Sequence, residues 1–267
     1  MKTLRFIGVA LLTVLMSVSF SACGGSDDDD SVPGGSSESG GITPDKLLVK
    51  ETIQRENENI TYEYSYDSQG RVIRKDRKEN GNSDDYYDYY VYTYIDNLIV
   101  QKHFYAYGGG SMETKYTLEN GLIVSEEVNG TIKNQYTYEN SYLATRNQTV
   151  GRYKYIWNNG NLTSIKWQSE WQSDENATSK GGKNYEYTSY AAPQGFVIDY
   201  VEEDLGKFFG KSSKNLPSKF TEVNNDGEIS EQITYDWTLK DGLPVKLVVM
   251  EKDGGGIYTT THTYEWQ

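Results

Sequence analysis

Side chains that commonly carry out chemistry are few in this chain of 267 residues. It has two histidines, His103 and His262, and one cysteine, Cys23. A zinc site needs several convergent His, Cys or carboxylate ligands, and neither histidine has a partner at metal-binding spacing. The chain also lacks a Gly-x-Ser-x-Gly motif and a phosphate-binding glycine loop before a helix. We therefore expect no metal, no cofactor and no nucleophilic catalysis, and the sequence favours a noncatalytic protein.

Carboxylates are the remaining catalytic candidates, because two acids suffice for glycoside hydrolysis. The chain has 39 acidic residues, so a catalytic pair cannot be identified from the sequence. A polysaccharide-acting enzyme with a carboxylate pair in a concave face therefore stays open as an alternative. The formal net charge of −13 excludes a nucleic-acid partner, since phosphate binding requires a basic surface.

Aromatic residues in irregular segments are the candidates for binding. Trp171 lies in a long polar stretch between two strand-like segments, and Tyr105 and Tyr107 adjoin a run of glycines. Aromatic faces outside a core can stack on sugar rings or anchor a protein partner. The alternative for Trp171 is that its ring folds back onto the edge of the sheet. The leading hypothesis is that loops at one rim bind an extracellular ligand, a glycan or another envelope protein.

Cys23 has a different chemistry. Residues 1–22 place Lys2 and Arg5 ahead of an apolar run, which is typical of a signal peptide. The stretch FSAC that ends at Cys23 resembles a bacterial lipobox, in which the cysteine becomes the acylated first residue. A lone cysteine cannot form an internal disulfide, so lipidation explains Cys23 better than an ordinary secretory signal with a stray cysteine. Each buried methylene contributes about 0.8 kcal/mol to membrane anchoring.

Residues 23–44 are rich in glycine, serine and acid and lack apolar periodicity, which predicts a flexible tether. The four aspartates at 27–30 resemble the acidic export tag of Bacteroidetes surface lipoproteins; a solvated charge run is the alternative. We expect a protein of the outer membrane, held by acyl chains on Cys23 and facing the cell exterior.

Residues 45–267 have the composition of one β domain, with many tyrosine, threonine, valine and isoleucine residues. A unit of alternating aromatics, a turn and an apolar strand recurs along the chain. In the first copy, Tyr62, Tyr64 and Tyr66 share one face of a strand and precede a turn closed by Gly70. Other copies include YVYTYIDNLIVQKH, KYTLENGLIVSEE, QYTYENSYLATRN and YKYIWNNGNLTSIKW. Each unit predicts a β-hairpin.

Single hairpins are marginal in water, so the units must pair side by side. We predict an all-β fold: a large, curled antiparallel hairpin meander of about sixteen or seventeen strands, forming an open barrel or a spiral-like sheet with the tyrosines inside. Around residues 199–210, Asp199 and Glu202 fit a capping box and Gly210 a helix stop. We expect one short amphipathic helix covering an end or the concave face, with a strand over 196–201 as the alternative.

The residues YSYDSQGRVI resemble the YD repeat, which builds spiral β-hairpin shells in bacterial surface and toxin proteins. From Lys46 to Gln267 the chain also resembles an uncharacterised family of Bacteroidetes lipoproteins described as porin-like. The resemblance implies the fold and the cellular location, and it identifies no functional residues. Lipid-facing strands need a continuous apolar face, whereas Glu63, Ser65, Lys75 and Arg77 are expected opposite the tyrosines. We therefore predict a soluble domain outside the membrane.

Overall fold

The computed structural model describes residues 46–80, 86–106, 108–169, 181–198, 200–201, 203–253 and 255–267. They form sixteen strands and one 3₁₀ helix, η1 (Glu203–Phe209). The strands are β1 (Leu48–Arg55), β2 (Glu58–Tyr66), β3 (Val72–Asn80), β4 (Tyr86–Ile95), β5 (Leu98–Phe104), β6 (Ser111–Glu119), β7 (Leu122–Val128), β8 (Thr131–Glu139), β9 (Tyr142–Gln148), β10 (Gly151–Asn158), β11 (Asn161–Ser169), β12 (Gly182–Ala191), β13 (Asn215–Val223), β14 (Ile229–Lys240), β15 (Leu243–Asp253) and β16 (Gly256–Trp266). Among these residues, no helix has the length and apolar character needed to cross a bilayer.

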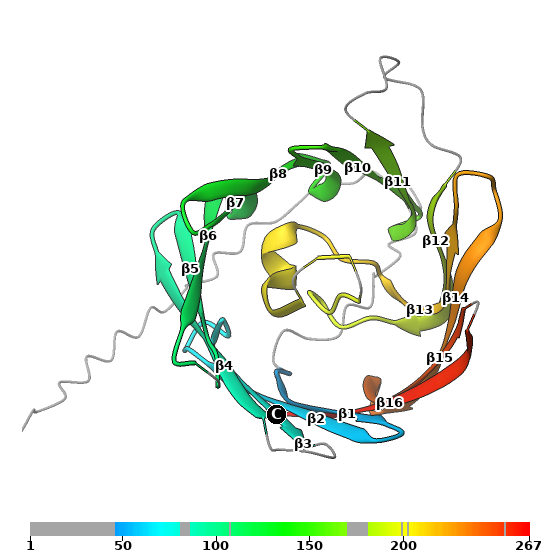
Figure 1. Ribbon diagram of the computed structural model, residues 1–267, viewed down its shortest axis with the longest axis horizontal. Helices are drawn as coiled ribbons and strands as arrows, with labels where there is room; N and C mark the ends of the chain where they lie inside the picture. The colour runs from blue at the N-terminus through cyan, green and yellow to red at the C-terminus, as the bar shows by residue number, and fades with distance from the viewer. Residues whose placement is uncertain are drawn as a thin grey trace, which may run out of the picture. The chain divides into compact units, whose positions relative to one another are not determined.

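The sixteen strands form a closed antiparallel barrel (Figure 1). Every strand pairs with its neighbours in sequence, and β1 closes the ring by pairing with β16, where Glu51 lies opposite Tyr264. The backbones of Leu47 and Gln267 exchange two hydrogen bonds of 3.0 Å. The all-β class predicted from the sequence is confirmed, but the open barrel or spiral-like sheet is wrong, because the first and last strands pair.

Most of the repeated tyrosines point into the barrel, as their spacing predicts. Buried inward tyrosines come from strands all around the ring: Tyr92, Tyr116, Tyr136, Tyr155, Tyr185, Tyr235 and Tyr264. Tyr87 of β4 has the opposite parity, and its side chain is exposed on the outside of the barrel. The tyrosines combine a large apolar area with a hydroxyl that can be satisfied in a partly polar interior.

Aromatic side chains also join most of the hairpins to the preceding strand. Seven even-numbered strands carry a tyrosine or tryptophan that donates a hydrogen bond to a backbone carbonyl of the strand before it. The donor–acceptor pairs are Tyr66–Leu48, Tyr94–Val72, Tyr138–Ile123, Trp157–Leu143, Tyr187–Leu162, Trp237–Pro217 and Trp266–Pro244. Each bond satisfies a carbonyl near a strand end at a net stabilisation of about 1 kcal/mol. Leucine lacks this donor, which explains the preference for tyrosine and tryptophan.

Register shifts near the turns change which side chains face inward. Between β2 and β3, Ser65 lies opposite Arg74, and Tyr66 opposite Val72, so one residue is extra on β3. As a result Lys75 and Arg77 lie opposite Tyr64 and Tyr62 and share their inward face. The expectation that these two cations lie outside is therefore wrong. The outward face of β2 and β3 instead carries Glu63, Arg74, Asp76 and Lys78.

The connection between β12 and β13, residues 192–214 and here called the inserted segment, folds into the barrel (Figure 1). Its Leu205 and Phe209, both in η1, are 0% and 4% exposed. The predicted helix is thus present at 203–209, but it is a 3₁₀ turn inside the ring. Gly210 follows it with φ +85, as a helix stop requires. Asp199 and Glu202 lie outside the described residues, and 196–198 and 200–201 form no strand.

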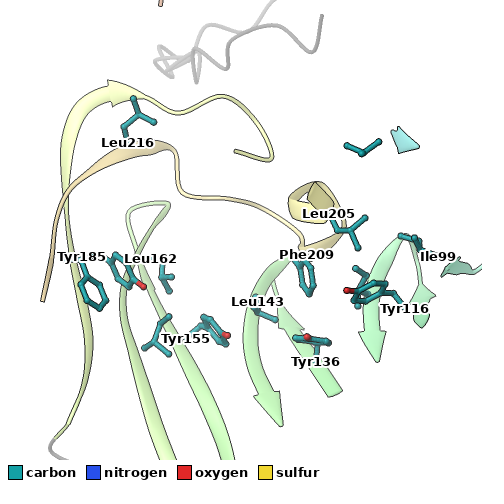
Figure 2. Close-up of a cluster of buried hydrophobic side chains, with 14 of the residues drawn as sticks. Ile99, Tyr116, Tyr136, Leu143, Tyr155, Leu162, Tyr185, Leu205, Phe209 and Leu216 are labelled. Atoms are coloured by element: carbon teal, nitrogen blue, oxygen red, sulfur yellow. The ribbon is translucent and has the colours of Figure 1, made fainter. Parts of the chain in front are cut away.

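The inserted segment closes one end of the barrel, which we call the closed end. It is held there by hydrogen bonds to three turns, and the donor–acceptor pairs are Lys207 to Gly70, Lys211 to Ser141 and Lys214 to Gly160. Phe209 points from η1 toward Tyr136 and Leu143 of the wall (Figure 2). The turns at the other end, which we call the open end, include residues 105–106 with 108–110, 129–130 and 224–228.

Candidate functional site

The barrel encloses a cavity of about 410 Å³ on the open-end side of the inserted segment. Its volume lies within the range of small-molecule binding sites. The floor is formed by Tyr200, Val201 and Phe209 of the inserted segment. The walls come from strands β6 to β12 and comprise Tyr116, Glu126, Asn134, Tyr136, Arg146, Tyr153, Tyr155, Ile165 and Lys183. Aromatic rings and a few charged groups therefore face one space.

Arg146 of β9 enters this cavity from the tyrosine face, since it pairs in register with Tyr136 and Tyr153. Its guanidinium lies 4.3 Å from the centre of the Tyr153 ring, a cation–π contact. Its Nε is buried and has no hydrogen-bond partner within the described part of the chain. The guanidinium is stacked on Tyr153, and no described residue accepts a hydrogen bond from it.

Tyr153 is supported from behind by Trp167, whose ring centre is 4.6 Å away. The start of β10 makes room for this indole because residue 151 is glycine. A Cβ on Gly151 would lie 2.9 Å from two ring carbons of Trp167 and 2.4 Å from the carbonyl oxygen of Gln168. Glycine at position 151 therefore leaves the space that the Trp167 ring needs to pack against Tyr153.

Glu126 is the one carboxylate among the described residues that line the cavity. Its Oε2 accepts hydrogen bonds from Asn134 at 2.6 Å and from the Tyr136 hydroxyl at 2.8 Å. Gln148 in turn donates to Asn134 at 2.9 Å. Burial, followed by the charge of Glu126, raises the pKa of Tyr136 well above its usual range. Glu126 is therefore satisfied by neutral donors and stays separate from Arg146.

Two further groups on the wall are positioned to contact a ligand. The ammonium of Lys183 lies 5.2 Å from the Phe220 ring centre and forms no ion pair with any described carboxylate. The hydroxyl of Tyr155 has no hydrogen bond in the described residues, and burial raises its pKa to about 12. The phenol is thus protonated at neutral pH and can donate a hydrogen bond.

The opposite wall carries two histidine–carboxylate pairs. His103 Nε2 lies 2.7 Å from Asp88, and His262 Nδ1 lies 2.8 Å from Glu51. His103 is also stacked by Tyr90, at 4.0 Å between ring centres. Across the described ranges, no group of three His, Cys, Asp or Glu side chains is arranged to hold a metal ion.

A second cavity of about 340 Å³ lies beside the inserted segment near the closed end. Phe196, Trp266 and Tyr66 line it, together with Asp204. Asp204 accepts hydrogen bonds from Lys75 at 3.0 Å and from the Tyr92 hydroxyl at 2.5 Å. These contacts hold η1 to the wall.

The aromatics selected from the sequence lie outside the cavity wall or outside the described residues. Tyr105 follows β5 at the open end, is 37% exposed and packs on His103 at 4.3 Å between ring centres. Trp171 and Tyr107 lie outside the described residues. Sequence reasoning missed Arg146 and Lys183. The signal that could have found Arg146 is a cation that pairs in register with inward tyrosines on both neighbouring strands.

Comparison with known proteins shows what the fold resembles. A porin-like protein from Bacteroides uniformis has a TM-score of 0.59 at 17% identity, over 82% of this chain and 98% of the other. A porin-like protein from Bacteroides vulgatus has a TM-score of 0.54 at 14% identity, over 84% and 99%. No family model and no curated protein matches the sequence. The chain therefore shares the barrel fold of these porin-like proteins, and the likeness shows the fold alone.

Proposed function

We propose that this chain is a noncatalytic binding protein of the bacterial envelope, which takes a small extracellular ligand, such as a glycan, into the barrel from the open end. The single observation that carries this proposal is the cavity above the inserted segment, walled by tyrosines and holding two cations that form no ion pair with a described carboxylate. Small-molecule sites combine apolar and aromatic walls with a few placed polar groups. Of the three aromatic residues selected from the sequence, Tyr105 is the one in the described part of the chain, and at the open end it could contact the ligand.

The outer wall supports a barrel that lies outside the lipid. Charged side chains occupy its outward face on many strands, and several pair with one another, as in Lys78–Glu63, Lys50–Glu265 and Lys102–Glu113. Each Lys or Arg at a bilayer midplane costs about 2–4 kcal/mol in a membrane barrel. We therefore retain anchoring by acyl chains on Cys23, with the barrel in water.

The position of the first described strand agrees with such an anchor. β1 begins at the closed end, because Leu47 and Gln267 pair beside the β2–β3 turn. The chain that leads back to Cys23 therefore enters the barrel at the closed end. Replacing Cys23 by serine should move the protein from the membrane fraction to the soluble fraction. If the serine variant remains in the membrane fraction, lipid on Cys23 is not the anchor.

The enzyme alternative has less support within the described residues. Glycoside hydrolysis by two acids needs a facing pair, and Glu126 is the one carboxylate on the described wall of the cavity. Three other inward acids, Glu222, Glu231 and Glu251, line neither cavity. A purely structural role predicts a filled interior, whereas the barrel holds an open space of about 410 Å³.

Calorimetric titration of the full chain in detergent with a panel of mono- and disaccharides tests the proposal. A sugar that binds should lose at least tenfold in affinity when Tyr153 is replaced by alanine, because its ring walls the cavity. Tyr190→Ala is the matched control, since Tyr190 is 48% exposed and lines neither cavity. Equal effects of both variants, or no binding by any sugar, would overturn the proposal. Binding that is lost only with Tyr105→Ala would indicate a partner at the rim, and release of a cleaved product would indicate an enzyme.

A further inference from the structure

We infer that the ligand carries an anionic group, a carboxylate or a sulfate, attached to a ring, and that Arg146 binds this group. The inference rests on the function proposed above, because it specifies the chemistry of the molecule that enters the same cavity. It follows from the hydrogen-bonding state of the two cations, from the ring surfaces beside them and from the charge of the whole chain.

Arg146 has an unused set of hydrogen-bond donors. No hydrogen bond or ion pair joins its side chain to another described residue, and its guanidinium stacks on the face of Tyr153. A guanidinium that is partly buried and already oriented by stacking loses little entropy when it binds an anion. Its planar donors match carboxylate and sulfate oxygens in a two-point contact. The group is therefore prepared for an anion that no described residue supplies.

Other inward cations show that the barrel normally pairs its charges. Lys75 forms an ion pair with Asp204 at 3.0 Å, and Arg77 forms one with Glu79. Arg146 and Lys183 both line the 410 Å³ cavity, yet neither lies within 4.0 Å of a carboxylate among the described residues. The chain has 39 acidic and 26 basic residues, so carboxylates are abundant. Neither cation forms an ion pair with a described carboxylate, although Lys183 lies opposite Glu222 and its charge acts on Glu231. Arg146 therefore favours an external anion most directly.

The remaining wall suits a ring rather than a bare ion. The Tyr153 ring lies between the Arg146 guanidinium and the Trp167 ring, at 4.3 and 4.6 Å, and Tyr155 contributes a protonated hydroxyl without a partner in the described residues. Aromatic side chains of the wall can pack on a sugar or aryl ring, while the hydroxyl can donate to a ring substituent. Glu126 accepts hydrogen bonds from Asn134 and Tyr136 and forms no ion pair with Arg146, so the guanidinium has no direct carboxylate contact among the described residues.

The test is calorimetric titration of the full chain with four probes at low ionic strength: glucuronate, glucose 6-sulfate, benzoate and glucose. We expect at least one anionic sugar to bind tenfold or more tightly than glucose. Arg146→Gln should remove that difference, Arg146→Lys should keep part of it, and Lys183→Gln should reduce it. Raising the salt concentration should lower the affinity for the anionic probe and leave the affinity for glucose unchanged.

Lys154→Gln is the matched control. Lys154 follows Tyr153 on β10 and lies opposite Thr145, the neighbour of Arg146, but its side chain is exposed on the outer face. It should leave every affinity unchanged, and circular dichroism should show that all variants remain folded. Benzoate binding as tight as glucuronate would assign the anion to a non-sugar acid. Equal binding of glucose and both acidic sugars, or no effect of Arg146→Gln, overturns the inference and leaves the binding function standing. If none of the four probes binds, the result counts against both this inference and the proposed binding function.

Discussion

Lys75 of β3 and Asp204 of η1 form a buried ion pair of 3.0 Å inside the barrel, although 129 residues separate them in sequence. Their side chains are 13% and 1% exposed, and the Lys75 ammonium also lies 4.6 Å from the centre of the Tyr62 ring. This contact fastens the inserted segment to the wall opposite the 410 Å³ cavity. The floor of the cavity depends on such anchors, because it is built from the inserted segment.

Replacing Lys75 by methionine should destabilise the barrel by about 3 kcal/mol, since it leaves the Asp204 carboxylate buried without its cation. Lys78→Met on the same strand is the matched control. Lys78 pairs with Glu63 on the outside, where both side chains are about half exposed, so its loss should cost less than about 1 kcal/mol. Urea denaturation of both variants measures the difference. Equal costs would show that the inner pair does not hold the inserted segment.

The bonds from aromatic side chains to backbone carbonyls should contribute to stability one by one. Tyr138→Phe removes only the hydroxyl that donates to the carbonyl of Ile123 at 2.6 Å, and should cost about 1–2 kcal/mol. Tyr190→Phe removes an exposed hydroxyl and should change the unfolding free energy by less than about 0.5 kcal/mol. Thermal unfolding of the two variants tests this difference; a shift of the same size in both would contradict the role given to these bonds.

The amino-acid sequence predicts the hairpins well because their signals are local. The alternation of Tyr62, Tyr64 and Tyr66 followed by Gly70 predicts a strand, a face and a turn within a few residues. Closure is different, since it depends on β1 pairing with β16 about 200 residues away and on the tilt accumulated over all the strands. No local pattern carries that information.

The candidate site was less predictable for the same reason. Arg146 and Lys183 lie on β9 and β12 and meet at one cavity only after the barrel closes. The β-bulge opposite Tyr66 adds one residue to β3 and so turns the Lys75 side chain into the barrel. Simple alternation of side chains along the strand would place this cation outside. Tyr105 was selected because a glycine run follows nearby, which is a local signal, and its role in binding stays a prediction.

Gly210 should tolerate no side chain. Its φ is +85, and a Cβ there would lie 2.3 Å from the carbonyl oxygen of Ser141. Gly227 has a similar φ of +89 but open space around it, so Gly227→Ala reports the backbone strain alone, about 1–2 kcal/mol. Gly210→Ala should lower the unfolding free energy clearly further, because the inserted segment must move away from the β8–β9 turn. A Gly210→Ala barrel as stable as Gly227→Ala would mean that this contact is dispensable.

Glu231 should make the stability depend on pH. Burial, together with the charges of Glu251 and Glu222, raises the pKa of its carboxyl. The folded state then holds this proton to higher pH than the unfolded state, so stability falls as pH rises through the folded pKa. Glu231→Gln should therefore stabilise the barrel at pH 7 and have little effect at pH 4. Glu139→Gln, at an exposed position in β8, serves as the control and should show no such difference. Stabilisation by Glu231→Gln that is equal at both pH values would contradict this origin.

Thiol labelling tests most directly whether the barrel is open to solutes at one end and closed by the inserted segment at the other. The natural chain has one cysteine, Cys23, so its own reactivity is the background. Lys183→Cys on the cavity wall should react with a small thiol reagent nearly as fast as Lys154→Cys on the outer face. Ser213→Cys, at a residue 9% exposed beside Leu162, should react at least a hundredfold more slowly. Equal rates at positions 183 and 213, or no reaction at position 183, would contradict the account.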